Sequence, residues 1–385
     1  MLNFTTLPAL SLYIHYPWCV QKCPYCDFNS HAVNAANDIK QRDEQYVTAL
    51  LEDLQQELPA IWGRTVQSIF IGGGTPSLID PEQLHRLLSH IRSLVKLSPL
   101  AEITLEANPG TVDQVKFAEF YAAGINRLSI GVQSFDDILL EKIGRVHNSQ
   151  QACQAIETAQ SVGFDNINMD LMYGLPGQTL DGAIADVQQA INFQTSHLSH
   201  YQLTLELNTF FAVHPPPLPD GDLSYDMQIK CQELLAENNF NHYEISAYAK
   251  ENQQCRHNIN YWQFGDYIGI GAGAHGKISN AQQQNIIRRW KEKQPFTYME
   301  KSSMIGGEGK LSRQDIGFEF MLNTSRLVEG FSSDLFARQT GMAINHIEKD
   351  LKKAVDLGLI EWQLHHIKPT QRGLQYLNEL QTIFL

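Results

Sequence analysis

The chain has 385 residues, of which 43% are hydrophobic and 18% charged, a composition typical of a globular protein with one large domain and a smaller one. The formal charge of −13 argues against general nucleic-acid binding, for which a basic patch is expected. No apolar run reaches the roughly 18 residues of a membrane span. Six cysteines without a signal segment favour a cytoplasmic setting over a disulfide framework.

The first part of the chain alternates short apolar runs with helical patterns. Six buried strands alternating with helices predict a parallel sheet. The spacing fits six units of a TIM-like partial barrel better than a Rossmann sheet, and in both folds functional residues lie at the carboxyl ends of the strands. The predicted strands are Leu10–Tyr16, Gln67–Ile71, Ala101–Ala107, Arg127–Val132, Asn166–Met172 and His197–Leu203, and the predicted helices are Ile39–Leu58, Pro81–Val95, Val112–Ala123, Ser149–Val162 and Leu180–Phe193.

The rest of the chain predicts a barrel extension and a small terminal domain. In chain order we expect a proline-rich loop, a helix, a strand, a glycine-rich stretch and a boundary, at Asn208–Gly221, Leu223–Glu237, His242–Ala247, Gly269–Gly276 and Ser302–Leu311. The tail resembles a winged-helix unit whose balanced charge favours a packing or partner role over DNA binding. Its elements are Phe331–Gln339, Asn345–Leu357, Leu359–Trp362 and His366–Lys368. We therefore expect three parts, residues 1–240, 241–300 and 301–385.

Three cysteines near the start of the chain, Cys19, Cys23 and Cys26, form a C-x3-C-x2-C run on a predicted loop. A structural zinc site takes four ligands, so three thiolates alone do not complete one. Three thiolates can hold three irons of a 4Fe–4S cluster and leave the fourth iron open to a small molecule. The alternative is a zinc site completed by His15 or His31.

Two motifs resemble the radical S-adenosylmethionine superfamily. Tyr25 directly precedes the last cysteine of the run, and the glycine-rich segment G-G-G-T-P from Gly72 to Pro76 follows the second predicted strand. Alone, a glycine triplet is equally typical of a tight turn. One βα unit after the cysteines, it is similar to the methionine-binding motif of that superfamily, because glycines allow backbone groups to approach a ligand.

The resemblance extends from Tyr13 to the C-terminal unit and points to the subgroup of the oxygen-independent coproporphyrinogen oxidase HemN and the heme chaperone HemW. The matching segments run from Tyr13 to Cys19, Glu106 to Pro109, Gly131 to Phe135, Gly144 to His147 and Asp170 to Pro176. A carboxylate suits the cationic part of S-adenosylmethionine, and an arginine can bind its carboxylate with two parallel bonds. The resemblance implies contacts with this ligand from Tyr13, Tyr25, Gly73, Gly74, Thr75, Glu106, Gln133, Arg145 and Asp170.

A further motif, H-N-x-x-Y-W, is similar to one in the heme chaperones of this subgroup. It implies heme binding by His257, Asn258, Tyr261 and Trp262, since histidine is a common ligand of heme iron and aromatic rings offer flat apolar area. On spacing alone, a core histidine beside packed aromatics is the more common interpretation. Cys255 and His275 are alternative ligands, and we interpret His214 as a loop histidine.

Two departures from the oxidases favour the chaperones. The oxidases have another cysteine where this chain has Phe28, and they carry an N-terminal extension, whereas 18 residues precede Cys19 here. The resemblance thus implies a heme carrier with a 4Fe–4S cluster and S-adenosylmethionine, whose partners are heme, an acceptor protein, an electron donor and, as an open alternative, a second copy of itself. A coproporphyrinogen III oxidase is the second hypothesis, and another radical enzyme such as a methyltransferase the third.

Overall fold

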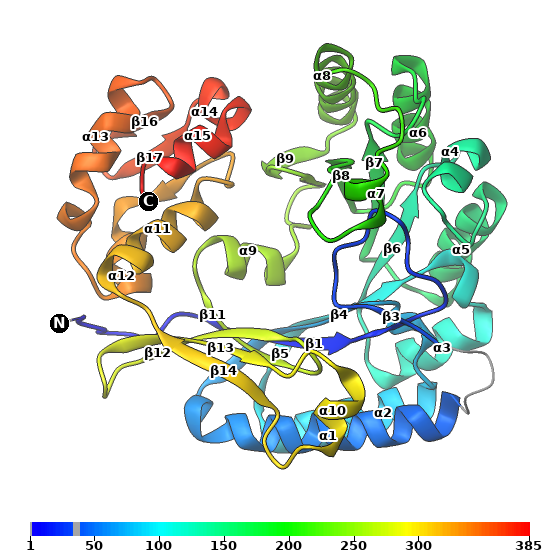
Figure 1. The fold of residues 1–385 in the computed structure, drawn as a ribbon, viewed down its shortest axis with the longest axis horizontal. Helices are drawn as coiled ribbons and strands as arrows, with labels where there is room; N and C mark the ends of the chain where they lie inside the picture. The colour runs from blue at the N-terminus through cyan, green and yellow to red at the C-terminus, as the bar shows by residue number, and fades with distance from the viewer. Residues whose placement is uncertain (1, 34–38) are drawn as a thin grey trace.

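The computed structural model describes residues 2–33 and 39–385, and within these ranges the chain forms a twelve-stranded sheet that curves into a partial barrel (Figure 1). The order across it is β14-β13-β12-β11-β1-β4-β5-β6-β7-β8-β10-β9. Its strands are β1 (Leu10–Tyr16), β4 (Thr65–Gly73), β5 (Lys96–Ala107), β6 (Arg127–Gln133), β7 (Ile167–Tyr173), β8 (His197–Gln202), β9 (Asn241–Glu244), β10 (Ala247–Ala249), β11 (Asp266–Ile270), β12 (His275–Asn280), β13 (Asn285–Lys291) and β14 (Ile305–Lys310).

The centre of this sheet is parallel. β1, β4, β5, β6, β7 and β8 pair in parallel in that order, and β11 pairs in parallel with the free side of β1. The prediction of a partial barrel built from six βα units is therefore confirmed. Because the strands are parallel, their carboxyl ends meet along one rim of the barrel, where the predicted polar residues lie.

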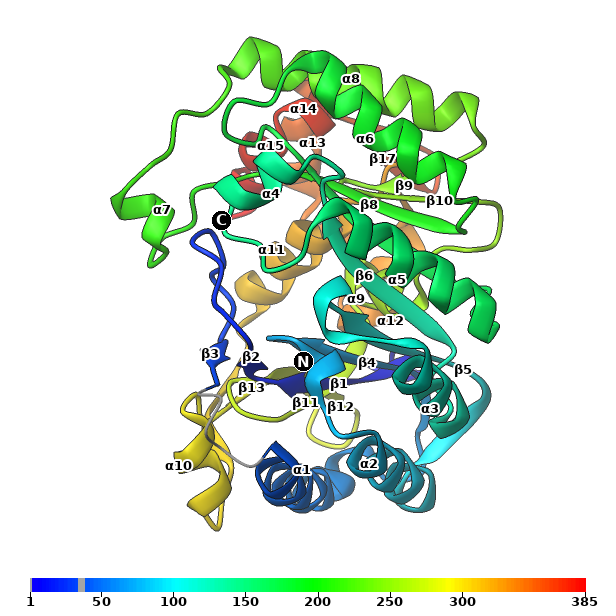
Figure 2. The same ribbon diagram turned by 90° about the vertical axis from the view of Figure 1, so that its right-hand side faces the viewer.

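Helices cover the outer face of the sheet (Figure 2). The second of them, α2, begins at Pro81 after Asp80, whose side chain accepts a hydrogen bond from the backbone N–H of Gln83. It buries one stripe that includes Leu84 and Leu88. The helices of this part are α1 (Ile39–Ile61), η1 (Pro76–Leu78), α2 (Pro81–Leu94), η2 (Pro109–Thr111), α3 (Gln114–Ala123), α4 (Asp137–Lys142), α5 (Ser149–Val162), α6 (Leu180–Asn192), α7 (Phe210–Val213), α8 (Gly221–Glu237), α9 (Arg256–Trp262) and α10 (Pro295–Glu300).

Three predicted segments differ from the structure. The strand expected at His242–Ala247 is a hairpin of two short strands, β9 and β10. The proline-rich loop contains the short helix α7. The glycine cluster expected to mark a boundary at Ser302–Leu311 instead holds β14, which pairs with β13 at the edge of the large sheet. The C-terminal domain accordingly begins after β14.

The C-terminal domain contains α11 (Arg313–Thr324), α12 (Ser333–Thr340), η3 (Ile344–His346), α13 (Glu348–Asp356), α14 (Gln371–Gln375), α15 (Leu377–Thr382) and a sheet of order β15-β17-β16, formed by Phe331–Ser332, His366–Pro369 and Ile360–Gln363. Its own core includes Phe320 and Phe336, and Phe264 and Ile286 of the barrel part join this core. The domain therefore packs firmly against the large sheet. Among the described residues, no helix combines the length and apolar character needed to cross a bilayer.

Candidate functional site

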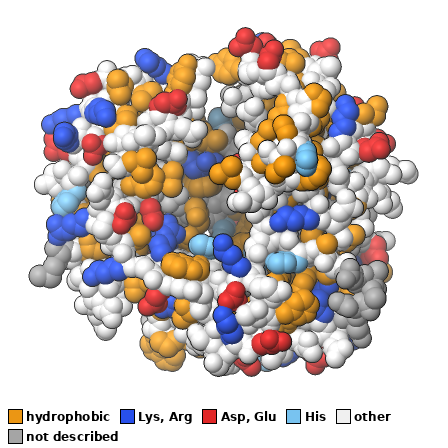
Figure 3. Space-filling view, in the orientation of Figure 1, with side chains coloured by type: hydrophobic (Ala, Val, Ile, Leu, Met, Phe, Trp, Pro, Cys, Tyr) orange, Lys and Arg blue, Asp and Glu red, His pale blue; other side chains and the backbone are white. Residues whose placement is uncertain are grey.

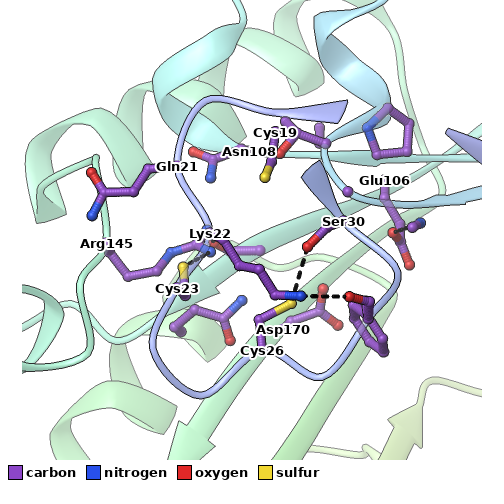
Figure 4. Close-up of a pocket in the computed structure, with 18 of the residues that line it drawn as sticks. Cys19, Gln21, Lys22, Cys23, Cys26, Ser30, Glu106, Asn108, Arg145 and Asp170 are labelled. Carbon is purple, nitrogen blue, oxygen red and sulfur yellow. Dashed lines mark hydrogen bonds between the residues drawn. The ribbon is translucent and has the colours of Figure 1, made fainter. Parts of the chain in front are cut away.

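The three cysteines of the C-x3-C-x2-C run lie on a loop at the carboxyl end of β1. The loop is closed at its base by a short parallel pair, β2 (Trp18–Cys19) and β3 (His31–Ala32). Within the loop, the backbone N–H of Cys26 donates to the carbonyl of Cys23 at 3.1 Å. All three thiols line one cavity of about 290 Å³ at the barrel rim (Figure 4).

Asn29 ties this loop to a distant part of the sheet. Its side-chain amide donates to the carbonyl of Ala272 at 2.9 Å and to that of Lys293 at 2.8 Å. Its own carbonyl is hydrogen-bonded to His15 Nε2 at 2.8 Å. The cysteine loop is thus fixed both to β1 beneath it and to the turn that leads into β12.

The glycine-rich turn after β4 forms the adjoining wall of the cavity. Gly73 has a φ of 120°, a conformation that L side chains rarely adopt, and a Cβ atom there would lie 2.6 Å from Cε1 of His15. A Cβ atom on Gly74 would lie 2.5 Å from the carbonyl oxygen of Trp18. The two glycines are therefore required for the turn to pack directly against the base of the cysteine loop.

Polar side chains from three neighbouring strands complete the cavity. Glu106 of β5 accepts a hydrogen bond from the backbone N–H of Gly73 at 3.0 Å. Asp170 of β7 accepts hydrogen bonds from Asn168 Nδ2 at 2.8 Å and Ser129 Oγ at 3.3 Å. Gln133, at the end of β6, accepts from the hydroxyl of Tyr201 at 2.8 Å. Because the strands are parallel and in register, these three side chains lie on one side of the same cavity at the barrel rim.

Arg145 lies where the cavity meets the cysteine loop. One of its terminal nitrogens donates to the carbonyl of Gly131 at 2.7 Å, and the other lies 3.7 Å from Sγ of Cys23. Its Nε is buried and has no hydrogen-bond partner among the described residues. A buried guanidinium with a free donor is suited to an anionic ligand, which can accept from the unused N–H.

The carboxyl groups of the cavity have perturbed acidity. Burial, with a smaller contribution from the negative charge of Asp170, raises the pKa of Glu106 to about 8. Burial also raises the pKa of Asp170, although hydrogen bonds from Asn168 and Ser199 act in the opposite direction. A cation placed between the two carboxyl groups would favour their charged forms. The cavity therefore suits a ligand that carries both a positive charge and a carboxylate.

The donor set at the loop fits an iron–sulfur cluster. Burial raises the pKa of Cys19 to about 11 and also raises that of Cys26, so these thiols stay protonated until metal displaces the protons. Within the described residues, no three Cys, His, Asp or Glu side chains gather closely enough for one ion. A cubane binds each thiolate at a separate iron and does not need such convergence.

The zinc alternative finds little support in the two histidines that would complete it. Both ring nitrogens of His15 are already engaged, since Nδ1 is hydrogen-bonded to the hydroxyl of Tyr13 at 2.9 Å and Nε2 to the carbonyl of Asn29. Nε2 of His31 lies 3.3 Å from Oδ1 of Asn29. Ligation by His15 would require one of its hydrogen bonds to break, and ligation by His31 would have to use its other ring nitrogen.

The structure brings together nearly all residues that were predicted to contact S-adenosylmethionine. Tyr13 is the exception, because it contacts His15, Phe70 and His257 inside the barrel and does not line the cavity. Ser129 was missed, although the period of two along β6 places it on the same face as Gly131. Further lining residues that sequence reasoning did not select are Gln21, Lys22, Ser30, Asn108 and Tyr201.

The H-N-x-x-Y-W motif forms α9, which crosses the inner side of the sheet between the barrel and the C-terminal domain (Figure 1). His257 is buried against the rings of Phe70 and Tyr13, at centroid distances of 5.1 and 6.5 Å, and its Nδ1 lies 3.3 Å from Ser68 Oγ. Asn258, Tyr261 and Trp262 are partly exposed. The imidazole of His257 thus packs against β4 and β1, whereas the other three named residues of the motif are partly exposed.

The alternative heme ligands differ in accessibility. Cys255 is fully buried at the start of α9, and its sulfur lies 3.4 Å from a carboxylate oxygen of Glu102. The structure therefore contradicts Cys255 as a ligand that a bound heme can reach. His275, at the start of β12, is exposed.

Residues 13–190 match the model of the Radical SAM superfamily, and residues 311–376 match that of the HemN C-terminal domain. The heme chaperone HemW of Escherichia coli strain K12 is 44% identical over 98% of this chain and 99% of that protein. HemW of Haemophilus influenzae is 44% identical over 98% of both chains, and HemW of Bacillus subtilis is 33% identical over 97% of this chain and 99% of its own.

Among solved structures, coproporphyrinogen III oxidase (HemN) from Escherichia coli has the same fold, with a TM-score of 0.82 at 22% identity over 98% of this chain and 90% of that one. The partial barrel, the cysteine loop and the glycine-rich turn define a radical S-adenosylmethionine protein. Within that class, the full-length similarity places the chain more narrowly: it belongs to the HemW family.

Proposed function

We propose that this protein is a heme chaperone, which binds heme and passes it to an acceptor protein. The observation that carries the proposal is the 44% identity, over 98% of the chain, to proteins named heme chaperone HemW. A carrier of heme needs an apolar, accessible surface for the macrocycle and positive charge for its propionates. Aromatic rings and arginine side chains near α9 offer both properties.

The barrel would also carry a 4Fe–4S cluster and S-adenosylmethionine. We assign Cys19, Cys23 and Cys26 to the cluster, which supplies one-electron chemistry when bound. Glu106 would bind the ligand's ammonium group, Arg145 its carboxylate, and Asp170 its ribose hydroxyls. The ring of Tyr25 offers a face for adenine, Gln133 offers an amide, and Gly73, Gly74 and Thr75 offer backbone groups. Tyr13 would act indirectly, through its hydrogen bond to His15.

The surface for heme would lie beside α9, which carries His257, Asn258, Tyr261 and Trp262. The rings of Tyr261 and Trp262 are in contact, and the hydroxyl of Tyr267 joins Tyr261 to Arg288. A space-filling view shows a hollow at the centre of this face, between the C-terminal domain and the barrel, with cationic and histidine side chains in and around it (Figure 3). Arg326 of the C-terminal domain lies over the ring of Trp262 at 4.3 Å. Aromatic area beside arginines suits an apolar macrocycle that carries carboxylates.

The second candidate is an oxygen-independent coproporphyrinogen III oxidase. It is favoured by the match of residues 311–376 to the HemN C-terminal domain. An oxidase would remove propionate carboxyl groups, whereas a chaperone would leave its tetrapyrrole unchanged. The proposed partners are an acceptor protein for heme, an electron donor and a second copy of this chain.

A single anaerobic preparation with reconstituted cluster distinguishes the two functions. Hemin titration, followed by the Soret band, should give saturable binding with a stoichiometry near one. Assay of the same protein with coproporphyrinogen III, S-adenosylmethionine and a reductant should give no protoporphyrinogen IX above background. Absence of saturable hemin binding would reject the chaperone function, and turnover would favour the oxidase.

A further inference from the structure

We propose that Ser68 and Ser11, two buried serines of the barrel, position the imidazole of His257 so that its Nε2 atom is offered to heme iron. The inference deepens the proposed function and rests on it, because it takes His257 of the H-N-x-x-Y-W motif as the iron ligand. Neither serine lines the cavity beside the cysteine loop, so the chemistry assigned to that cavity leaves both without a role.

The two serines interrupt strands that are otherwise buried and largely apolar. Ser11 of β1 and Ser68 of β4 are each 1% exposed, and they lie directly opposite one another in the parallel register. Their hydroxyl oxygens are hydrogen-bonded at 2.8 Å. Burial of a hydroxyl group is costly unless it is hydrogen-bonded. Two apolar residues would fill the same space without that cost, so the pair points to a role beyond packing.

The chain of hydrogen bonds through the serine pair begins and ends on α9. Nδ1 of His257 lies 3.3 Å from Ser68 Oγ, and at the other end Asn260 Nδ2 donates to Ser11 Oγ at 2.9 Å. Asn260 occupies one of the unspecified positions of the H-N-x-x-Y-W motif, and its amide also donates to the carbonyl of Asp266 at 2.9 Å. Two residues of the motif, one helical turn apart, are thus joined through β1 and β4.

This arrangement leaves the second ring nitrogen of His257 available. Nε2 makes no hydrogen bond within the described part of the chain and is accessible to solvent, whereas Nδ1 of His200 is buried without a partner. In a neutral imidazole one nitrogen carries the proton and the other has the free lone pair. Ligation of iron through Nε2 therefore needs the proton on Nδ1, and Ser68 Oγ is the acceptor within reach. Ligating histidines usually donate their other ring N–H in this way.

The serine pair has the capacity to accept this N–H. Each hydroxyl has one proton and two lone pairs. Ser68 can therefore accept from Nδ1 of His257 and donate to Ser11, whose oxygen also accepts from Asn260. The direction of donation then runs from both ends of the chain toward Ser11, and Nε2 keeps its lone pair for the metal.

Other contacts hold both ends of the chain in place. The backbone N–H of His257 donates to Glu102 Oε1 at 3.3 Å, which fixes the start of α9 against β5. The amide of Asn260 fills space that only a glycine at position 265 leaves, because a Cβ atom on Gly265 would lie 1.9 Å from Asn260 Oδ1. With these contacts fixed, the bond to the serine decides the ring orientation, since a half-turn of the imidazole would replace Nδ1 by a carbon atom.

Hemin titration and redox titration of full-length variants test this assignment. Ser68→Ala should raise the hemin Kd about tenfold, as is typical when a ligating histidine loses its hydrogen-bond partner. It should also shift the midpoint potential of the heme upward, because an imidazole without this bond donates less charge to iron. Ser11→Ala should move both quantities in the same direction but by less, since Ser68 remains. Ser68→Thr keeps the hydroxyl and should retain the potential of the wild type.

Ser134→Ala is the matched control. Ser134 is buried, and its hydroxyl donates to Asp186 at 2.8 Å, outside the chain of hydrogen bonds that reaches α9. Its loss should lower the thermal stability by an amount similar to Ser68→Ala and leave the hemin Kd and the potential unchanged. A merely structural role of Ser68 would lower the stability of both variants and change the potential of neither.

The outcomes separate this inference from the proposed function. If the wild type does not bind hemin, the chaperone function fails and the inference fails with it. If the wild type binds and His257→Ala keeps its Kd and Soret band, His257 is not the ligand and the inference alone is wrong. If His257→Ala loses the binding while Ser68→Ala keeps the Kd and potential of the wild type, the ligand stands and the serine pair does not position it. Circular dichroism of each variant excludes misfolding as the cause.

Discussion

Glu106 connects the local environment of one residue to a property that can be measured in solution. In the folded protein its pKa is about 8, against an ordinary value of 4.5, because burial and the charge of Asp170 disfavour the carboxylate. Between these two values the folded state holds a proton that the unfolded chain has lost. Stability therefore falls as pH rises through this window, by about 1.4 kcal/mol for each unit of the shift.

The expected result is a pH-dependent free energy of unfolding that Glu106→Gln flattens between pH 4.5 and about 8. The uncharged amide removes the titration but preserves the shape of the side chain. Chemical denaturation at several pH values measures the effect, and Glu379→Gln on the exposed surface of α15 serves as the control. A variant with the same pH profile as the wild type would show that Glu106 does not titrate as expected.

Folding raises the pKa of Glu106, whereas binding of S-adenosylmethionine should lower it. A cationic ligand beside Glu106 lowers the pKa of the carboxyl group, so at neutral pH binding should release about one proton. Isothermal titration in two buffers of different ionisation enthalpy measures this release, which Glu106→Gln should abolish. Equal apparent enthalpies in both buffers for the wild type would contradict the contact with Glu106.

Substitution of different cysteines should have different effects on the amount of bound iron. Cys23→Ala should reduce bound iron to near zero after anaerobic reconstitution and remove the broad visible absorbance, because two thiolates cannot retain the cubane. Cys153→Ala, on the outer helix α5, should keep full iron content. Retained iron in the Cys23 variant would refute the ligand assignment.

Among the elements, the turn after β4 has the tightest packing requirement. In Gly74→Ala the new methyl group meets the Trp18 carbonyl at 2.5 Å, and backbone atoms cannot rotate away as a side chain can. We expect destabilisation by about 1–3 kcal/mol and weaker binding of S-adenosylmethionine. Gly221→Ala at the start of α8 has open space around its Cβ position and should be neutral or slightly stabilising. Thermal unfolding of both variants tests the difference.

The parallel strands could be predicted because each is buried on both faces and is read as a short apolar run. The site followed from the same argument, since the polar residues directly end those runs. The β9–β10 hairpin was not predicted, because Ile245 and Ser246 between the strands carry no glycine or proline signal. β14 was missed because glycines usually mark a break. Here Gly307 is required by the indole of Trp290, a contact between residues distant in sequence.

The burial of His257 could not be derived from the motif. Six of the seven residues of α9 are polar or aromatic, and the face that a short helix buries depends on the strands beneath it. Ser68 and Phe70 of β4 provide the inner contact, but nothing in the linear sequence pairs them with a helix almost two hundred positions later. Tertiary packing therefore decided which part of the motif is accessible.

For the whole molecule, the relation between barrel and C-terminal domain depends on a shared apolar core, which includes Phe264 and Ile286, and on a few polar contacts beside α9. Arg326 bonds Glu244 and stacks on Trp262, while Glu319 bonds Arg288. Backbone bonds reinforce this contact, since the N–H of Val328 donates to the carbonyl of Tyr243 at 3.1 Å. The position of the small domain is thus coupled to the residues that we assign to heme.

Arg326→Ala should loosen this interface. The loss of a partly buried ion pair and a cation–π contact should cost about 1–3 kcal/mol and increase amide hydrogen exchange at α11 and at β9. Lys352→Ala breaks an exposed pair with Glu348 on α13 and should cost less than about 0.5 kcal/mol. Equal exchange in both variants would show that Arg326 does not hold the domains together.

Asn29 links the cysteine loop to the turn between β11 and β12. Its amide donates to the carbonyls of Ala272 and Lys293, so a change in the cysteine loop on loss of the proposed cluster would be passed to the start of β12. We expect heme uptake to weaken in the iron-free protein, and Asn29→Ala to remove the difference between the loaded and unloaded states. The supply of iron for the iron–sulfur cluster would then control the delivery of heme.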